Sequence, residues 1–413
     1  MNLYLFDDND CASIYGIGTY LKEITGALEN TDIYVHVVHL HSVHEEFVIE
    51  DKNQVEHWYI PEVRNYKTVS GSAKKVDDYI RNVSYLLRLH IIDTKDLVFH
   101  FNYNLSQLLA KELKAKFNCK TVATVHYLKW ALDFHGNLNM LHTLQLKPED
   151  QRNATEKMVL RTEEYEVRLY NEVDHLIILS EYTAALLCNE YQIDPGKITV
   201  IPNGLGDIIK EISIDRDKLR KKWRISENEY VLLFSGRLHN GKGLSFLIKA
   251  FHNVLEKSPN CRLMIVGSGD YTMYLKETKD ICAKVTFTGI VEKKELEELY
   301  QIADIGMLPS LTEQCSYVII EMMMHGLPII TTNAPGPAEM TIDGESSLQC
   351  PLIINQDSVK IDTDLLAEKI ISLLQNPEER RRLGINARKR YEKIYSRDVF
   401  RKNMLNFYQS LYE

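Results

Sequence analysis

The sequence lacks Cys-x-x-Cys pairs, and its seven cysteines are an odd number. This excludes a fully paired disulfide framework and a zinc-ribbon site, and it is typical of a reducing compartment. No run approaches the roughly 18 consecutive apolar residues that a membrane-spanning helix needs. The first residues also lack the basic and apolar segments of a signal peptide. We therefore expect a cytoplasmic protein, and we leave open a peripheral attachment to the inner face of the membrane.

An excess of positive charge is also missing. The 49 lysines and arginines are outnumbered by 58 aspartates and glutamates, which gives a net charge of −9. This charge argues against general adsorption to nucleic acid or to anionic lipid, and leaves open local basic patches. The 413 residues, of which 45% are hydrophobic, exceed the roughly 250–300 residues at which one core stops growing. The composition predicts a globular protein with two domains.

Short apolar runs alternate with longer amphipathic segments along the chain, a pattern typical of βαβ units and parallel sheets. A Pro-Asn-Gly break at 202–204 separates two such halves. We expect an α/β protein of two tandem Rossmann-like, doubly wound parallel-sheet domains, 1–203 and 204–395, and a long loop at 129–150. The expected strands cover residues 2–6, 33–40, 97–101, 121–125, 175–179, 199–201, 230–234, 262–266, 285–287, 305–308, 328–331 and 347–350.

Ligands of open α/β sheets bind where a strand ends and the next helix begins. The first such junction carries Gly16 and Gly18, just before a helix expected from Thr19. Paired glycines allow the backbone to approach a ligand closely. Leu21 replaces the third glycine of the dinucleotide fingerprint, so a ligand loop and a purely structural turn are equally compatible with this segment.

The second junction, residues 234–244, nearly matches the Walker A loop but has Gly243 where a magnesium-binding serine or threonine belongs. This argues against the alternative of a P-loop hydrolase. Two cations remain, Arg237 and Lys242, and each charge-assisted hydrogen bond to a phosphate contributes about 1.5–3 kcal/mol. Together with the N-terminus of the helix that follows, they could hold a diphosphate without metal. The alternative is two solvated cations on a loop.

The third junction, residues 310–328, carries two carboxylates, Glu313 in a loop and Glu321 on a helix expected to start near Ser316. The neighbours of Glu321 are almost all apolar. A carboxylate inside a buried helix needs hydrogen-bond partners, which ribose hydroxyls or nearby backbone groups would provide.

These segments, in this order, resemble the family 4 retaining glycosyltransferases of GT-B fold. The resemblance covers nearly the whole chain and implies two domains facing an interdomain cleft, with a final helix (396–413) crossing back to the first. The Glu-x7-Glu pair followed by Gly-x-Pro is its most specific part. The matching segments are Gly16–Gly18, Thr124–His126, Val200–Gly204, Phe234–Arg237 with Lys242-Gly243, Ile265–Gly269 and Glu313 with Glu321.

The resemblance also implies roles for individual residues. Arg237 and Lys242 correspond to the pair that clamps the donor diphosphate, and His126 to the histidine that faces the donor sugar. Glu313 corresponds to the carboxylate that holds sugar hydroxyls, and Glu321 to the ribose ligand. The expected catalytic set is thus His126, Arg237, Lys242 and Glu313; the expected substrate-binding set is Gly16, Gly18, Gly236, Ile290, Gln314, Cys315, Ser316 and Glu321.

The implied activity is a retaining, metal-independent transfer of a hexose from a nucleotide-diphosphate sugar, without a cofactor, as in polysaccharide biosynthesis. The acceptor would be a glycan, a lipid-linked sugar or a protein. Family members usually have Gly-Phe-Gly after the first glutamate, whereas this chain has Gln314-Cys315-Ser316, so the sugar is not transferable by analogy. The alternative is a GT-B pseudoenzyme that binds nucleotide sugar as an activating subunit.

Overall fold

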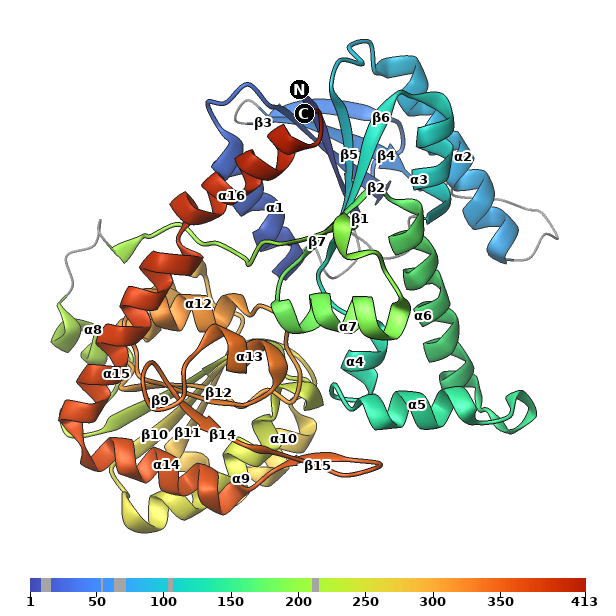
Figure 1. The fold of residues 1–413 in the computed structure, drawn as a ribbon. Coiled ribbons are helices and arrows are strands. Elements are labelled where there is room, and N and C mark those ends of the chain that lie inside the picture. Colours follow the sequence, from blue (N-terminus) through green and yellow to red (C-terminus); the bar gives the residue numbers. More distant parts are fainter. Residues whose placement is uncertain (9–15, 53–54, 63–71, 103–106, 210–214) are drawn as a thin grey trace. The chain divides into compact units, whose positions relative to one another are not determined.

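The computed structural model describes residues 1–8, 16–52, 55–62, 72–102, 107–209 and 215–413 (Figure 1). They form two compact units. Unit 1 comprises Met1–Lys129, Arg152–Gly204 and Arg397–Glu413, and unit 2 comprises Trp130–Gln151 and Leu205–Ser396. The segment Trp130–Gln151 therefore groups with the second unit, where the sequence prediction had placed it in the first.

Unit 1 is built on an eight-stranded sheet with the order β3-β4-β2-β1-β5-β6-β7-β8. All neighbouring pairs are parallel except β3 with β4. The parallel strands fan out in both directions from the β1–β5 neighbours, as in a doubly wound fold, which makes β1–β5 the topological switch point. The strands are β1 (Asn2–Asp8), β2 (Tyr34–Ser42), β3 (Val48–Lys52), β4 (Val55–Pro61), β5 (Leu97–Phe101), β6 (Cys119–Val125), β7 (His175–Ile178) and β8 (Ile198–Val200).

Helices cover both faces of this sheet (Figure 1). Helices α1 and α16 pack against each other, and α3 contacts both α2 and α6. The guanidinium of Arg397, at the start of α16, donates to both carboxylate oxygens of Glu23 on α1, at 2.8 and 3.0 Å. The helices are α1 (Gly16–Leu28), α2 (Ser72–His90), α3 (Gln107–Lys116), α6 (Ala154–Glu172), α7 (Glu181–Tyr191) and α16 (Arg397–Ser410).

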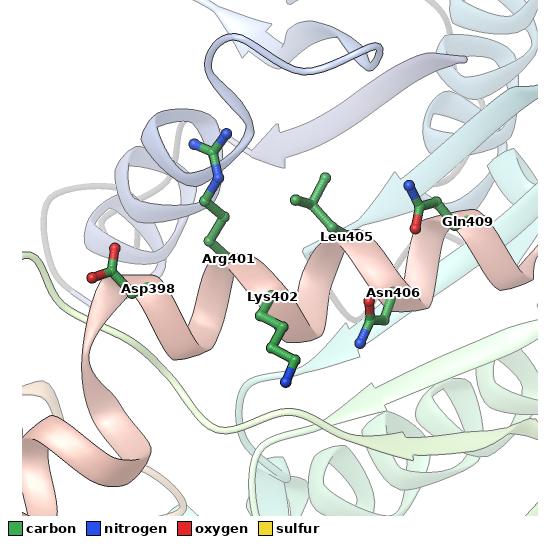
Figure 2. Close-up of a pocket in the computed structure, with 6 residues that line it drawn as sticks. All are labelled: Asp398, Arg401, Lys402, Leu405, Asn406 and Gln409. Carbon is green, nitrogen blue, oxygen red and sulfur yellow. The ribbon is translucent and has the colours of Figure 1, made fainter.

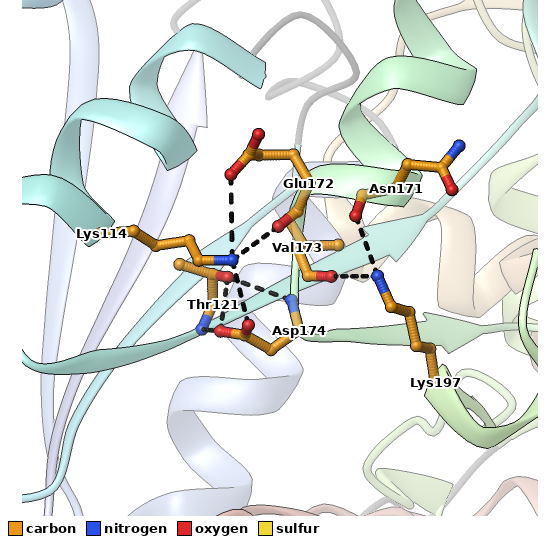
Figure 3. A network of polar contacts seen from close by, with 7 residues as sticks. All are labelled: Lys114, Thr121, Asn171, Glu172, Val173, Asp174 and Lys197. Carbon is orange, nitrogen blue, oxygen red and sulfur yellow. Dashed lines mark hydrogen bonds and ion pairs between the residues drawn. The ribbon is translucent and has the colours of Figure 1, made fainter.

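A polar network closes the amino-terminal edge of this sheet (Figure 3). The Asp174 carboxylate accepts hydrogen bonds from the backbone N–H and the hydroxyl of Thr121, both at 2.8 Å, and from Lys114 Nζ at 3.1 Å. Burial opposes ionisation of Asp174, but these hydrogen bonds outweigh it and lower the pKa of the carboxyl. The network ties α3, β6 and β7 together at the edge opposite to the one where ligands of such sheets bind.

Unit 2 contains a six-stranded parallel sheet with the order β11-β10-β9-β12-β13-β14. Counted along the chain this is the order 3-2-1-4-5-6 of a Rossmann fold, with its switch point between β9 and β12. The strands are β9 (Tyr230–Ser235), β10 (Cys261–Val266), β11 (Val285–Gly289), β12 (Ile305–Leu308), β13 (Ile329–Thr332) and β14 (Leu348–Cys350), with a separate hairpin of β15 (Leu352–Ile354) and β16 (Val359–Ile361).

The helices of unit 2 pack in groups. Helix α9 contacts α10 and α14, α8 contacts α11, and α15 contacts α12 and α14. The helices are α8 (Arg216–Lys222), α9 (Leu244–Lys257), α10 (Thr272–Glu277), α11 (Lys293–Ile302), α12 (Tyr317–Met324), α13 (Pro335–Met340), α14 (Thr363–Gln375) and α15 (Pro377–Arg390), with short turns η5 (Asn240–Lys242) and η6 (Lys279–Lys284).

The prediction of a long loop at residues 129–150 is wrong. The segment forms two short helices, α4 (Lys129–Asp133) and α5 (Leu138–Leu146). Asn137 caps α5 by accepting from Asn139 N at 3.1 Å, and its amide donates to the carbonyl of Asn355 in the β15–β16 hairpin at 2.8 Å. The helices are too short to give a readable period in the sequence, and they are stabilised by contacts with distant residues.

Candidate active site

The loops that follow β9 and β12 meet at the switch point of unit 2, where ligands of this fold bind. Lys242 ends the first loop and Glu313 lies in the second, and their side chains form an ion pair. Only 20% of the Lys242 side chain and 14% of the Glu313 side chain are exposed. The Ser310 hydroxyl donates to the same Glu313 oxygen at 3.2 Å. The structure therefore brings together two residues that the sequence placed 71 positions apart.

Gly243 explains why the loop after β9 departs from a P-loop. Its φ is +69°, and a Cβ atom at this position would lie 1.9 Å from the carbonyl oxygen of Pro309. Only glycine fits such a position. Leu311 N also donates to the carbonyl of Gly241 at 2.8 Å. The two loops are thus in direct backbone contact, and a serine or threonine hydroxyl has no room between them.

The loop after β10 supports the other side of the β9 loop. Gly267 has a φ of +137°, and a Cβ atom there would lie 1.8 Å from the carbonyl oxygen of Gly236. Leu238 N donates to Ser268 O at 2.7 Å. Arg237 lies between these contacts and is exposed. The backbone around Arg237 and Lys242 is therefore fixed by its neighbours on both sides.

The second carboxylate of the pair, Glu321, accepts a hydrogen bond from the Tyr300 hydroxyl at 2.7 Å. The Tyr300 ring stacks on His325, with centroids 5.0 Å apart, and His325 pairs with Glu297 at 2.5 Å. These contacts are not evident from the sequence, because the spacing of α11, which carries Glu297 and Tyr300, shows only that one face of this helix is buried, and His325 follows a different helix, α12. Burial raises the pKa of Glu321 from 4.5 to about 7.

The raised pKa of Glu321 predicts a stability change with pH. A carboxyl whose folded pKa lies above its unfolded value favours folding only while it is protonated, so wild type loses this contribution as the pH rises through 7. We expect Glu321→Gln, which still accepts from Tyr300, to be more stable than wild type by about 1–2 kcal/mol at pH 8.5, with a smaller gain at pH 5. Chemical denaturation at both pH values measures this. An equal difference at the two pH values would contradict it.

The segment Gln314–Ser316 lies at the start of α12 and is packed closely. Cys315 and Ser316 are 8% and 6% exposed. Ser316 N donates to the Met340 sulfur, a weak acceptor, at 3.1 Å. A Cβ atom on Gly336 would lie 2.3 Å from the Gln314 carbonyl oxygen. The side-chain oxygen of Gln314 is buried and has no hydrogen-bond partner in the described part of the chain.

Ile290, which the resemblance places in the substrate-binding set, directly follows β11. Gly289 has a φ of +74°, and the side chain of Ile290 is 71% exposed. Gly267 N donates to the carbonyl of Gly289 at 3.0 Å, which joins this turn to the loop after β10. Ile290 thus lies at the carboxyl edge of the sheet that also carries Lys242 and Glu313.

In unit 1, His126 follows β6 at the carboxyl edge of the sheet. Its Nε2 lies 3.1 Å from Oδ1 of Asn102, and the Asn102 amide nitrogen donates to Phe6 O at 3.4 Å. This orientation of the amide places the proton of His126 on Nε2. Burial lowers the pKa of His126 to about 3, so the imidazole is neutral at physiological pH.

A buried network that sequence analysis missed lies beneath His126. His100 contacts the Tyr408 hydroxyl of α16 through Nδ1 at 2.6 Å and the Thr124 hydroxyl through Nε2 at 2.7 Å. Tyr20 OH lies 3.2 Å from the same Thr124 hydroxyl, and its ring meets that of His126 edge to face. The sequence shows only that His100 lies within an otherwise apolar strand. It does not reveal the residues that His100 contacts, because they lie far away in the sequence.

Gly16 and Gly18 do not form a turn that precedes a helix. Helix α1 begins at Gly16, so both glycines lie in its first turn, and neither has a positive φ. The helix therefore starts three residues before the Thr19 expected from the sequence, because glycine is tolerated at the exposed end of a helix. The polar segment before them, residues 9–15, lies outside the described residues.

A separate hollow of about 310 Å³ lies along α16. Figure 2 shows its side chains fanning out from this one helix. None of the expected site residues lines it. The lining residues are Asp398, Arg401, Lys402, Leu405, Asn406 and Gln409.

Over the residues with a described placement, no group of three or more His, Cys, Asp or Glu side chains could hold a metal ion. In the same residues, no helix has the length and apolar character needed to cross a membrane.

Comparison with known families gives two matches. Residues 14–206 match the model "Glycosyltransferase Family 4", and residues 215–390 match "Glycosyl transferases group 1". An uncharacterized glycosyltransferase of Methanocaldococcus jannaschii is 29% identical over 57% of this chain and 59% of its own length. A GDP-mannose-dependent phosphatidylinositol monomannoside mannosyltransferase of Corynebacterium glutamicum is 27% identical over 59% of this chain and 64% of its own. The chain thus spans about three fifths of these relatives.

Solved structures with a similar fold include the two that follow. Sucrose-phosphate synthase from Thermosynechococcus elongatus has a TM-score of 0.75 at 22% identity, over 100% of this chain and 99% of the other. Anabaena HepE, in complex with UDP and glucose, has a TM-score of 0.72 at 16% identity, over 99% of this chain and 100% of the other.

Proposed function

The chain belongs to the family 4 glycosyltransferases of GT-B fold, and on that premise we propose that it transfers a sugar from a nucleotide-diphosphate sugar to an acceptor hydroxyl. The observation that carries the proposal is the ion pair of Lys242 with Glu313 at the switch point of unit 2. A cation and a carboxylate at this place suit the two parts of the donor, its diphosphate and its sugar hydroxyls.

Breaking the bond between the sugar and the diphosphate leaves negative charge on the diphosphate. Fixed positive groups aimed at that charge lower the barrier. Lys242 and Arg237 would provide them, without a metal ion. We propose that the diphosphate replaces Glu313 as the partner of Lys242, which frees the Glu313 carboxylate to accept from sugar hydroxyls.

The remaining residues would orient the donor. Glu321, held by Tyr300 at 2.7 Å, would accept from the ribose hydroxyls. The neutral imidazole of His126 would face the sugar, and the backbone beside Ile290 would bind the nucleobase. We propose retention of the anomeric configuration, with the leaving phosphate oxygen taking the proton of the acceptor hydroxyl.

The acceptor would be a glycan, a lipid-linked sugar or a protein. Similar proteins are named for lipid and polysaccharide substrates, among them the phosphatidylinositol mannosyltransferase and a capsular polysaccharide biosynthesis glycosyltransferase of Staphylococcus aureus. The donor is best sought first among UDP-sugars, because HepE was solved with UDP-glucose.

The test is a panel of UDP-, GDP- and ADP-sugars with EDTA present, in which release of nucleoside diphosphate is followed without acceptor and then with glycan acceptors. We expect slow hydrolysis with one nucleotide series, and the same rate when EDTA is omitted. Failure of every donor to react or bind would contradict the proposal. Tight binding without turnover under any condition would instead indicate a binding subunit.

A further inference from the structure

The turn between α4 and α5 places a histidine against the loop that carries Lys242. A Cβ atom on Gly241 would lie 3.6 Å from His135 Nδ1. A Cβ atom on the next residue of the turn, Gly136, would lie 3.4 Å from the Thr312 hydroxyl, beside Glu313. The turn therefore touches both loops of the candidate site, at residues adjacent to Lys242 and Glu313.

The backbone of this turn adopts a costly conformation. His135 has a φ of +53° and Gly136 a φ of +75°. The left-handed region is unfavourable for a residue with a side chain, and such residues concentrate at functional sites. Asn137, which is 1% exposed, holds the turn through its hydrogen bond to Asn355. The position of His135 is thus imposed by the packing of the segment.

The imidazole of His135 has an unmet hydrogen-bonding capacity. Its Nδ1 is buried and makes no hydrogen bond within the described residues. A buried polar atom without a hydrogen-bond partner destabilises the folded protein, unless a bound ligand provides the missing hydrogen bond. The neighbouring His239 differs, because its Nδ1 already accepts from Gly241 N at 3.1 Å. His135 Nδ1, unlike His239 Nδ1, is therefore able to bind a ligand without breaking a described hydrogen bond.

We propose that His135 is a further donor-binding residue, whose Nδ1–H donates to the β-phosphate of the bound nucleoside diphosphate. This inference rests on the proposed function and adds a third side chain to Arg237 and Lys242. We assign the β-phosphate to His135 because the turn contacts Gly241 and Thr312, the residues next to Lys242 and Glu313. A neutral imidazole carries one N–H, so the bond needs no change of net charge.

The test is His135→Gly, because glycine adopts the left-handed backbone without strain and the variant removes only the imidazole. The probes are UDP and UMP, or the corresponding pair of the nucleotide series that the donor panel selects, measured by titration calorimetry. We expect the affinity for UDP to fall about tenfold and that for UMP to stay unchanged. His142→Gln, on α5 of the same segment, is the matched control and should bind both as wild type does.

Equal affinity of wild type and His135→Gly for UDP would overturn the inference and leave the proposed function intact. An equal loss for UDP and UMP would also overturn it, because the imidazole would then act on the fold of the site. If wild type bound no nucleoside diphosphate, the proposed function itself would fail.

Discussion

Replacing Lys242 by alanine should lower the rate of sugar transfer by about 10- to 100-fold. This corresponds to roughly 1.4–2.7 kcal/mol of lost transition-state stabilisation. The variant removes the cation that would meet the leaving diphosphate. It also leaves the carboxylate of Glu313, whose side chain is only 14% exposed, without its cationic partner and close to the phosphates. Steady-state kinetics with the donor found in the panel measure the effect.

Three variants give the controls for this prediction. Arg237→Ala should lower the rate about tenfold, less than Lys242→Ala, because Arg237 is exposed whereas Lys242 is largely buried. Lys242→Arg keeps the charge and should recover part of the activity. Lys249→Ala, on the exposed side of α9, should behave as wild type. Near-wild-type rates in both Lys242→Ala and Arg237→Ala would show that neither cation acts on the diphosphate.

Gly243→Ser should destabilise unit 2 by about 3 kcal/mol or more, although it completes the Walker A sequence. Serine would have to adopt a φ of +69° and place its Cβ atom 1.9 Å from Pro309 O. The loops after β9 and β12 would then have to separate. Urea unfolding measures the loss, and no magnesium-dependent ATP hydrolysis should appear.

Gly344→Ser is the matched control for this collision. Gly344 has a similar φ of +71°, but a Cβ atom there would meet nothing within 4 Å. This substitution should lower the free energy of unfolding by only about 1 kcal/mol, the energy needed to place a side-chain-bearing residue in the left-handed conformation. If Gly243→Ser and Gly344→Ser were equally stable, the close contact with Pro309 would not be what demands glycine.

The strands expected from the sequence are confirmed, because each is a short apolar run with clear turn residues on both sides. Strands β3 and β4 were missed. Strand β3 has no buried residue, and β4 has only two, Trp58 and Ile60, so neither is a continuous run of buried residues. The small hairpin of β15 and β16 was missed for a similar reason: Ile353 and Ile354 are apolar but exposed. Apolar patterning finds buried strands and overlooks those at the surface.

The part of the candidate site that follows from the order of the strands could be predicted from the sequence. Lys242 and Glu313 each follow a strand, and the order of the strands makes β9 and β12 neighbours. The supporting partners were not predictable. Tyr300 contacts Glu321, Asn102 contacts His126, and His135 lies beside Gly241. Each of these contacts comes from a different element, and no local pattern records which distant side chain a residue will meet.

The most direct test of the account is the affinity of wild type and Lys242→Ala for a nucleoside diphosphate and its monophosphate, measured by titration calorimetry with EDTA present. We expect wild type to bind the diphosphate at least about tenfold more tightly than the monophosphate, and Lys242→Ala to lose this preference. A Lys242→Ala variant that keeps the full preference would contradict the assignment of Lys242 to the diphosphate.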